Sequence, residues 1–309
     1  MRNYMQMKHY YKYIILIAAV LTIAACKSNN TDSESLSDSQ KLVLLDIKIE
    51  KSPKNAALLA ERARVLLNLG RVKDAVYDAN RAVSLDSSNV DYRMLQADAN
   101  FANGNISESY KALTEAERLA PDNTEVQLKM GEITFYSRDY DRSLRCLTKV
   151  TEKEPDNRTA LFMKGFIYKE KGDTSEAVIL LRKVCDLYPD YEPAFEELGV
   201  LYSTRKSPMA AEYLTTALNL EPNNTNAMYA LAMYHQERQE MDEAEGLYRR
   251  MLDVNDKSAD AWHNLGYIEL TYYHDYERAL TYFDSALTCD PNHEAAIKNL
   301  QVAFDAIKN

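Results

Sequence analysis

Glycine and proline are scarce in this chain: each occurs 8 times in 309 residues. Because these residues are the main breakers of regular structure, their scarcity favours helices joined by short turns over a strand-rich fold. Hydrophobic residues make up 46% of the chain and charged residues 27%. That is enough apolar material to build a core, so the bulk of the chain is not disordered.

The chain also lacks a net positive charge. It has 37 basic and 47 acidic residues, a net charge of −10, and none of the acids lies in residues 1–26. A surface this acidic repels phosphate backbones, so we expect no nucleic-acid partner. We attribute most of the charge to solubility.

Patterns typical of catalysis and metal binding are missing as well. None of the five histidines forms a helical pair at a spacing of four, and there is no Gly-rich phosphate loop or Gly-x-Ser-x-Gly elbow. We therefore expect no enzymatic activity, no catalytic residues, no metal and no cofactor. Apart from Cys26 the cysteines are Cys146, Cys185 and Cys289, an odd number. We expect small core residues rather than a disulfide framework.

The N-terminus has the pattern of an export signal. Three basic residues precede an apolar run over residues 14–25, which spans about 18 Å as a helix and is too short for a ~30 Å bilayer core. The run ends in Ile23-Ala24-Ala25-Cys26, which resembles the bacterial lipobox, so residues 1–26 are predicted to be a lipoprotein signal peptide with lipid attached at Cys26. An ordinary secretory signal ending near a cysteine is the alternative. Residues 27–40, rich in Ser, Asn and Asp, are predicted to be a flexible tether with a reach of roughly 20 Å.

Glycine and proline, although few, recur at one spacing. Pro121, Pro155 and Pro189 are 34 residues apart, and so are Gly131, Gly165 and Gly199. A period of 34 residues is typical of tetratricopeptide repeats.

On these residues the chain resembles the tetratricopeptide repeat family over roughly 250 residues. The resemblance implies an all-α, right-handed α-solenoid of helix-turn-helix repeats with terminal capping helices. Small residues such as Gly165 would let the second helix of a unit approach the first, and proline would end it. We expect a degraded half-repeat helix at 41–55, seven units over 56–293 and a C-terminal capping helix at 294–309. Units one to seven are 56–89, 90–123, 124–157, 158–191, 192–224, 225–258 and 259–293, with unit five one residue short and unit seven one residue long.

In this family the first helix of each unit lines a concave groove, through its second, fifth, ninth and twelfth positions. An exposed apolar patch there would mark a binding surface. The alternative is that the large residues pack against the next unit and are hardly exposed. Ala60 and Arg64 stand where a clamp for a C-terminal carboxylate needs Lys and Asn, so no such clamp is expected. The predicted groove residues are Met94, Phe101, Leu128, Phe135, Phe162, Phe166, Tyr229, Met233 and Tyr267, with the charges Arg64, Asp98, Glu132, Lys169 and Glu196.

These features predict a membrane-anchored scaffold or adaptor of the bacterial cell envelope that binds a peptide, helix or protein in its groove. An outer-membrane location is preferred to the inner membrane. One alternative is a self-associating structural component, or an assembly factor of outer-membrane, secretion or peptidoglycan machinery. A helical-repeat enzyme or solute-binding protein is a further alternative, but the sequence shows no convergent polar pocket for it.

Overall fold

A computed structural model describes residues 36–308, and within that range all regular structure is helical. This confirms the all-α fold class. The predicted signal peptide, including Cys26, lies outside the described residues. No helix between residues 36 and 308 is long and apolar enough to span a membrane.

Fourteen of the α-helices follow one another as seven pairs, with one further helix at each end of the described chain. The terminal helices are α2 (Asp38–Lys51) and α17 (Glu294–Lys308). The pairs are α3 (Ala56–Asn68) and α4 (Val72–Leu85), α5 (Val90–Ala102) and α6 (Ile106–Leu119), α7 (Thr124–Tyr136) and α8 (Tyr140–Lys153), α9 (Arg158–Glu170) and α10 (Thr174–Leu187), α11 (Glu192–Thr204) and α12 (Met209–Leu220), α13 (Thr225–Glu237) and α14 (Met241–Val254), and α15 (Ala259–Ile268) and α16 (Tyr276–Cys289).

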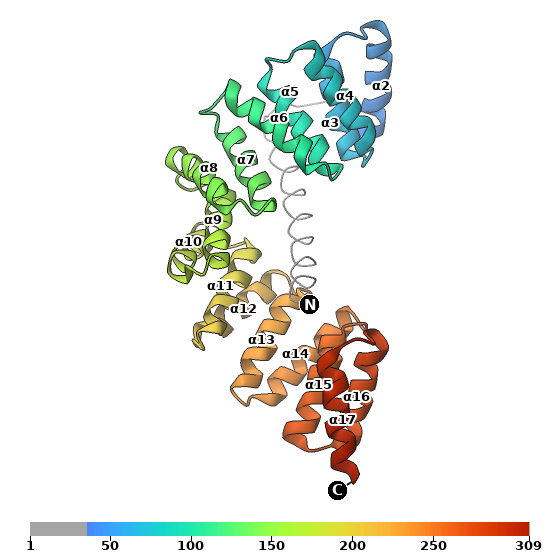
Figure 1. Ribbon diagram of the computed structural model, residues 1–309, viewed down its shortest axis with the longest axis vertical. Coiled ribbons are helices and arrows are strands. Elements are labelled where there is room, and N and C mark those ends of the chain that lie inside the picture. The colour runs from blue at the N-terminus through green and yellow to red at the C-terminus, as the bar shows by residue number, and fades with distance from the viewer. Residues whose placement is uncertain (1–35, 309) are drawn as a thin grey trace.

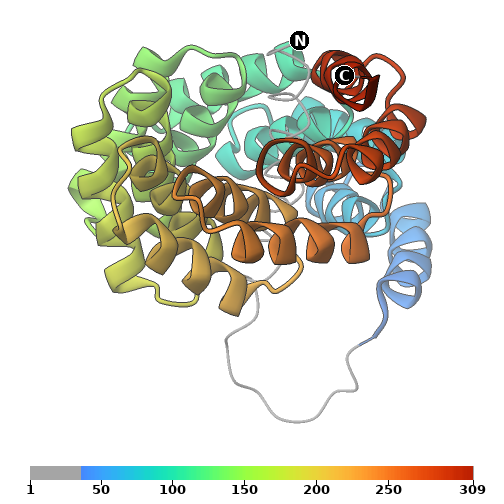
Figure 2. The same cartoon turned by 90° about the horizontal axis from the view of Figure 1, so that it is seen from below.

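The helices follow one another in chain order along the long axis of the molecule, with α2 and α17 at opposite ends (Figure 1). Seen along that axis, they wind into a solenoid (Figure 2). First helices of neighbouring units contact each other, as α3 does α5 and α11 does α13. Because first helices lie closer together than second helices, the solenoid bends with its first helices on the concave side.

Caps and turns explain where each helix begins. Asn side chains cap most first helices, as where Asn123 accepts a hydrogen bond from the backbone N–H of Val126. The turn between the two helices of every unit contains one residue with positive φ, a conformation that favours glycine. These residues are Gly70, Gly104, Arg138, Gly172, Lys206, Gln239 and His274.

Glycines in the first helices make room for large residues of the second helices, as predicted. A Cβ on Gly199 would lie 2.5 Å from Cγ of Leu214, and one on Gly266 would lie 2.7 Å from a ring carbon of Phe283. Side chains larger than hydrogen would therefore push the two helices of a unit apart.

The extra residue of unit seven is accommodated by a short π-helix, η1 (Glu269–Tyr273), at the end of α15. Buried Glu269 at its start pairs with Arg278 of α16, with 3.2 Å between Oε1 and a guanidinium nitrogen. The insertion is thus absorbed within the unit, and the pairing of α15 with α16 is kept.

Helix α2 begins at Asp38, inside the segment predicted to be tether. Ser37 forms a capping box with Gln40, which starts the helix three residues before the expected position. Leu45 and Ile49 bury one face of α2 against unit one. Arg62 of α3 also bonds both Asp46 of α2 and the buried Asp78 of α4, which ties the terminal helix to the first unit.

Candidate binding groove

A continuous run of aromatic rings connects units two, three and four along their first helices. Phe135 and Phe166 meet edge to face with ring centroids 5.6 Å apart. Phe135 also contacts Tyr136, which lies 5.0 Å from Phe101 of the preceding unit. Such pairs add to the energy of apolar burial and stiffen the joints between units. The run is completed by Phe162, 6.5 Å from Phe166 and 5.3 Å from Tyr191.

Most of these rings are buried between units rather than exposed in the groove. Phe135, Phe162 and Phe166 expose only 9%, 5% and 7% of their surface, and Met94 is also buried. Phe101, Leu128, Tyr229 and Met233 are half-buried, while Tyr267 is 38% exposed. In units two to four the predicted exposed apolar patch is therefore largely interior: Phe135 and Phe166 pack against each other across the unit boundary, and Phe162 packs against Phe166 and Tyr191.

Acidic side chains line the accessible part of the same region. The Nζ of Lys129 lies 2.8 and 3.0 Å from the two carboxylate oxygens of Asp98, which joins unit three to unit two. Burial raises the pKa of Glu132 to about 7; nearby Lys129 opposes this shift, and the negative charges of Asp98 and Glu125 add to it. Asp98 and Glu132 are half-buried and Glu125 is exposed, so this wall of the groove is negative.

Two further predicted charges join neighbouring units. Lys169 forms an ion pair with buried Glu197 of unit five, and its Nζ lies 4.1 Å from the centroid of the Phe166 ring. Glu196 accepts a hydrogen bond of 2.6 Å from the amide of Asn224, the residue that caps α13. Both charges therefore serve the contacts between units. Arg64, by contrast, is exposed on unit one.

The concave face of units six and seven has a different lining. Behind this face, the fully buried Tyr248 of the second helix α14 donates its hydroxyl to Gln236 and contacts the Sδ of half-buried Met233. The ring of His263 lies 6.4 Å from Tyr267 and 4.9 Å from His293. Burial, followed by the neighbouring His293, lowers the pKa of His263. This region combines polar aromatic and imidazole groups where units two to four have phenylalanine and carboxylates.

The sequence-based prediction of the groove did not include several residues of this region, because they fall outside the second, fifth, ninth and twelfth positions of their units. Lys129 and Glu197 hold the sixth position of their units, and Tyr136 the thirteenth. The hydroxyl of Tyr136 is buried and has no hydrogen-bond partner within residues 36–308. Helical spacing offers a signal for Lys129, since Glu125 and Glu132 lie four residues before and three after it.

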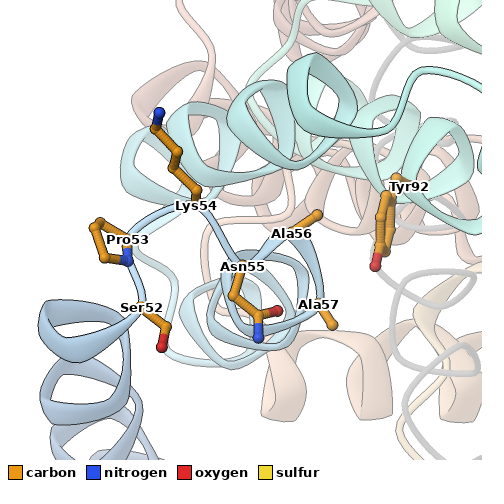
Figure 3. Close-up of a pocket in the computed structure, with 7 residues that line it drawn as sticks. All are labelled: Ser52, Pro53, Lys54, Asn55, Ala56, Ala57 and Tyr92. Carbon is orange, nitrogen blue, oxygen red and sulfur yellow. The ribbon is translucent and has the colours of Figure 1, made fainter.

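A shallow hollow lies away from this region, at the N-terminal edge of the array (Figure 3). It is formed by the turn between α2 and α3, together with Tyr92 at the start of α5. Its few polar groups do not converge on one point. In the described part of the chain, no group of three or more His, Cys, Asp or Glu residues could hold a metal ion. Cys146 and Cys185 are buried free thiols and Cys289 is a partly buried one.

Comparison with known proteins agrees with this architecture. The profile of the tetratricopeptide repeat family matches residues 60–124, 128–192, 200–261 and 229–294. The fold is similar to the C-terminal part of a repeat protein from Cytophaga hutchinsonii, with 16% identity, a TM-score of 0.62 and coverage of 78% of this chain and 99% of that one. A tetratricopeptide repeat protein from Parabacteroides merdae is 15% identical with a TM-score of 0.59, over 81% and 98% of the two chains.

A third similar structure is that of YrrB, described as a repeat protein with an unusual peptide-binding site. It is 21% identical with a TM-score of 0.50, over 60% of this chain and 96% of that one. No curated protein matches the sequence. At these identities the likenesses show the fold alone.

Proposed function

The chain belongs to the tetratricopeptide repeat family, and we propose that it is a lipid-anchored scaffold that holds a basic peptide or helix in its concave groove. Proteins of this family bind protein or peptide partners and typically act as non-enzymatic interaction scaffolds. The proposal adds two things to that general role: the chemistry of the partner and the attachment to a membrane.

The negative wall of units two and three, formed by Asp98, Glu125 and Glu132, carries the proposal for the partner. Asp98, Glu125 and Glu132 lie on the concave side, beside a ring system that is already rigid. A rigid wall loses little conformational entropy when a partner binds. Carboxylates along it complement lysine or arginine side chains, and half-buried Phe101 and Leu128 offer contacts for apolar ones.

The lipid anchor rests on the sequence Ile23-Ala24-Ala25-Cys26 after the apolar run. Acyl chains on Cys26 would contribute about 0.8 kcal/mol per buried methylene, so two or more chains would hold the protein firmly on a bilayer. The protein would then act in the bacterial cell envelope, on the outer membrane in preference to the inner, and bring its partner to that surface.

Exposed apolar residues on α17 favour a second candidate, self-association as a structural component or assembly factor. Ile297, Phe304 and Ile307 are each more than two-fifths exposed, and with half-buried Leu300 they form a stripe at spacings of three and four residues. Two such stripes could pair across a two-fold axis. Light scattering on the non-acylated chain separates the candidates, because a monomer excludes this pairing.

Partner capture tests the groove. With the acylated protein as bait, we expect the double variant Asp98→Asn and Glu132→Gln to lower partner recovery at least about tenfold. The control is Glu152→Gln with Asp186→Asn, which changes two exposed acids on the second helices α8 and α10. Equal recovery with both double variants would show that the negative wall does not bind the partner.

The pH dependence of capture tests the role of Glu132 itself. A cationic partner favours the ionised carboxylate, so binding should strengthen as the pH rises through about 7, the pKa of Glu132. Glu132→Gln should remove this part of the pH dependence. A profile that is unchanged in the variant would exclude direct contact with Glu132.

Membrane fractionation tests the anchor. Cys26→Ala should prevent acylation and release the protein from membranes washed with concentrated salt. A variant that stays with the washed membranes would show that Cys26 is not the anchor.

A further inference from the structure

A group of large apolar side chains is exposed on and beside two helices, α2 and α4. Helix α4 is the second helix of unit one, and α2 occupies the equivalent place before it. Val43 is 59% exposed, Tyr77 is 62% exposed, and Leu36, Leu44 and Ile47 are each between 44% and 45% exposed. We call these five residues the outer patch. Val43 and Ile47 lie on the side of α2 opposite the buried Leu45 and Ile49, while Leu36 precedes α2 and Tyr77 lies on α4. Helix α2 is therefore apolar on two sides, although only one of them packs against the protein.

The outer patch is special to this end of the solenoid. Val43 and Tyr77 are 34 residues apart and so occupy the same position of successive repeats. In the later second helices this position is polar or small, with one exception, Ile179. The equivalent residues are Lys111, Arg145, Ile179, Glu212, Gly246 and Thr281. At this repeat position, apolar residues thus occur at the N-terminal end and at Ile179, while the other later second helices carry polar or small residues.

Basic groups border the outer patch. The guanidinium of Arg81 lies 5.6 Å from the ring centroid of Tyr77, and it donates to the carbonyl of Pro53 just after α2. Residues 36–54 hold four lysines and three acids, whereas residues 55–308 hold 29 basic and 42 acidic residues. Apart from Tyr77, the patch therefore lies in the part of the described chain that anionic lipid repels least.

Chain length places the outer patch near a bilayer if Cys26 is acylated. Nine residues lie between Cys26 and Leu36, and if they form the flexible tether that the sequence predicts, its root-mean-square reach is roughly 17 Å. Helix α2 lies at the outer edge of the molecule in the view along the long axis (Figure 2), so its outward side is free to meet a flat surface.

We propose that the outer patch rests on the lipid surface to which the chain is anchored. Val43, Leu44 and Ile47 enter the boundary between headgroups and acyl chains, and Tyr77 lies at headgroup level, where aromatic rings with a polar tip are favoured. Lys48, Lys51 and Arg81 meet anionic headgroups. The proposal rests on the proposed lipid anchor and adds a second contact, which fixes the tilt of the solenoid relative to the membrane.

Vesicle flotation of the non-acylated chain from residue 27 tests the patch, since this chain keeps every described residue. The probe is a vesicle of phosphatidylethanolamine and phosphatidylglycerol. We expect measurable binding, and a loss of at least about tenfold for Val43→Ser with Ile47→Ser. The matched control is Ile179→Ser, which changes an apolar residue with 60% exposure at the repeat position of Val43. It should bind like the parent chain, and circular dichroism checks that all three proteins remain helical.

Two results would overturn the proposal: no binding by the parent non-acylated chain, or an equal loss in the double variant and the control. Conversion of a dimer to a monomer by the double variant, with no vesicle binding, would instead assign the patch to self-association. The acylated double variant separates this proposal from the anchor. This variant should stay with washed membranes through its acyl chains. If the protein with acylated Cys26 is instead released by the wash, the proposed anchor is wrong.

Discussion

The same repeat positions have different roles at the two ends of the concave face. In units two to four, Phe135, Phe162 and Phe166 are almost fully buried; Phe135 and Phe166 pack against each other across the unit boundary, and Phe162 packs against Tyr191. In unit seven, Tyr267 at an equivalent position remains 38% exposed. A position on the groove side of a first helix is therefore available to a partner only where the adjacent unit leaves it uncovered.

The two regions also differ in their titrating groups. Glu132 in unit three has a pKa raised to about 7, mainly by burial, while burial lowers the pKa of His263 in unit seven. Both groups favour the neutral form, yet their effects on stability run in opposite directions with pH. Alkaline conditions weaken the first region, and acid weakens the second.

Truncating a ring in each region gives the largest expected difference. Phe166→Ala should lower the free energy of unfolding by about 3–5 kcal/mol, because it opens a cavity between units three and four. Tyr267→Ala should change it by less than about 1 kcal/mol, since much of that ring already faces solvent. Urea unfolding followed by circular dichroism measures both. Similar losses would show that the two positions are equally structural.

A smaller difference is expected for the carboxylate of Glu132. The folded-state pKa is raised, so the stabilisation is complete below about pH 4.5, the unfolded value, and is lost as the pH rises through about 7. Between these two pH values, the free energy of unfolding of the parent protein should fall by about 2–3 kcal/mol relative to that of the Glu132→Gln variant. Urea titrations of both proteins at several pH values measure the difference, and parallel stability curves would contradict it.

At the C-terminal end the effect of pH is opposite to that at Glu132: acidification should destabilise this end. His293 accepts a hydrogen bond from the backbone N–H of Ala296 at the start of α17, and His263 contacts Asn299 of the same helix. The groups facing His263 are His293, Asp260 and Asn264. Because the pKa of His263 is lowered, its stabilising effect is present above about pH 6.5 and is lost as the pH falls. Hydrogen exchange should show α17 losing protection before α7 on acidification; simultaneous loss would argue against this local cause.

The smallest change in stability is expected from glycine substitutions in the turns, and it should be similar in the two regions. Arg138 in unit three and Gln239 in unit six hold the left-handed turn position with φ of 59° and 64°. Replacing either by glycine should stabilise the protein by about 0.5–1 kcal/mol, because glycine adopts this conformation without a steric penalty. Thermal unfolding should therefore show two similar shifts. Unequal shifts would mean that the turns contribute differently in the two regions.

Much of the local structure could be predicted from the sequence. The 34-residue spacing of proline and glycine predicted seven helix pairs, and the small residue of the first helix predicted the close approach that Gly199 and Leu214 show. The start of α2 was missed by three residues, because the Ser37–Gln40 capping box lies in a segment whose composition resembles a linker.

The groove could be predicted only in part. Helical spacing assigned residues to the concave side, but the assignment of these residues to a ligand stays a prediction. Whether Phe166 is buried depends on Phe135, 31 residues earlier, and whether Asp98 is paired depends on Lys129, also 31 residues away. Such partners come from neighbouring units, so the spacing within a single unit does not reveal them.

The sequence alone determined the secondary structure, the repeat period and the side of each helix that meets its partner, because these depend on contacts within about 34 residues that every unit repeats. The tertiary structure decided which of these sides remain accessible. In units two to four the stacking of neighbouring units buried the rings, while it left Asp98 and Glu132 half-buried and Glu125 exposed. On α2, Val43 and Ile47 are exposed, as is Tyr77 at the repeat position of Val43 on α4. Accessibility is a property of how units stack, and stacking depends on the side chains of two units at once.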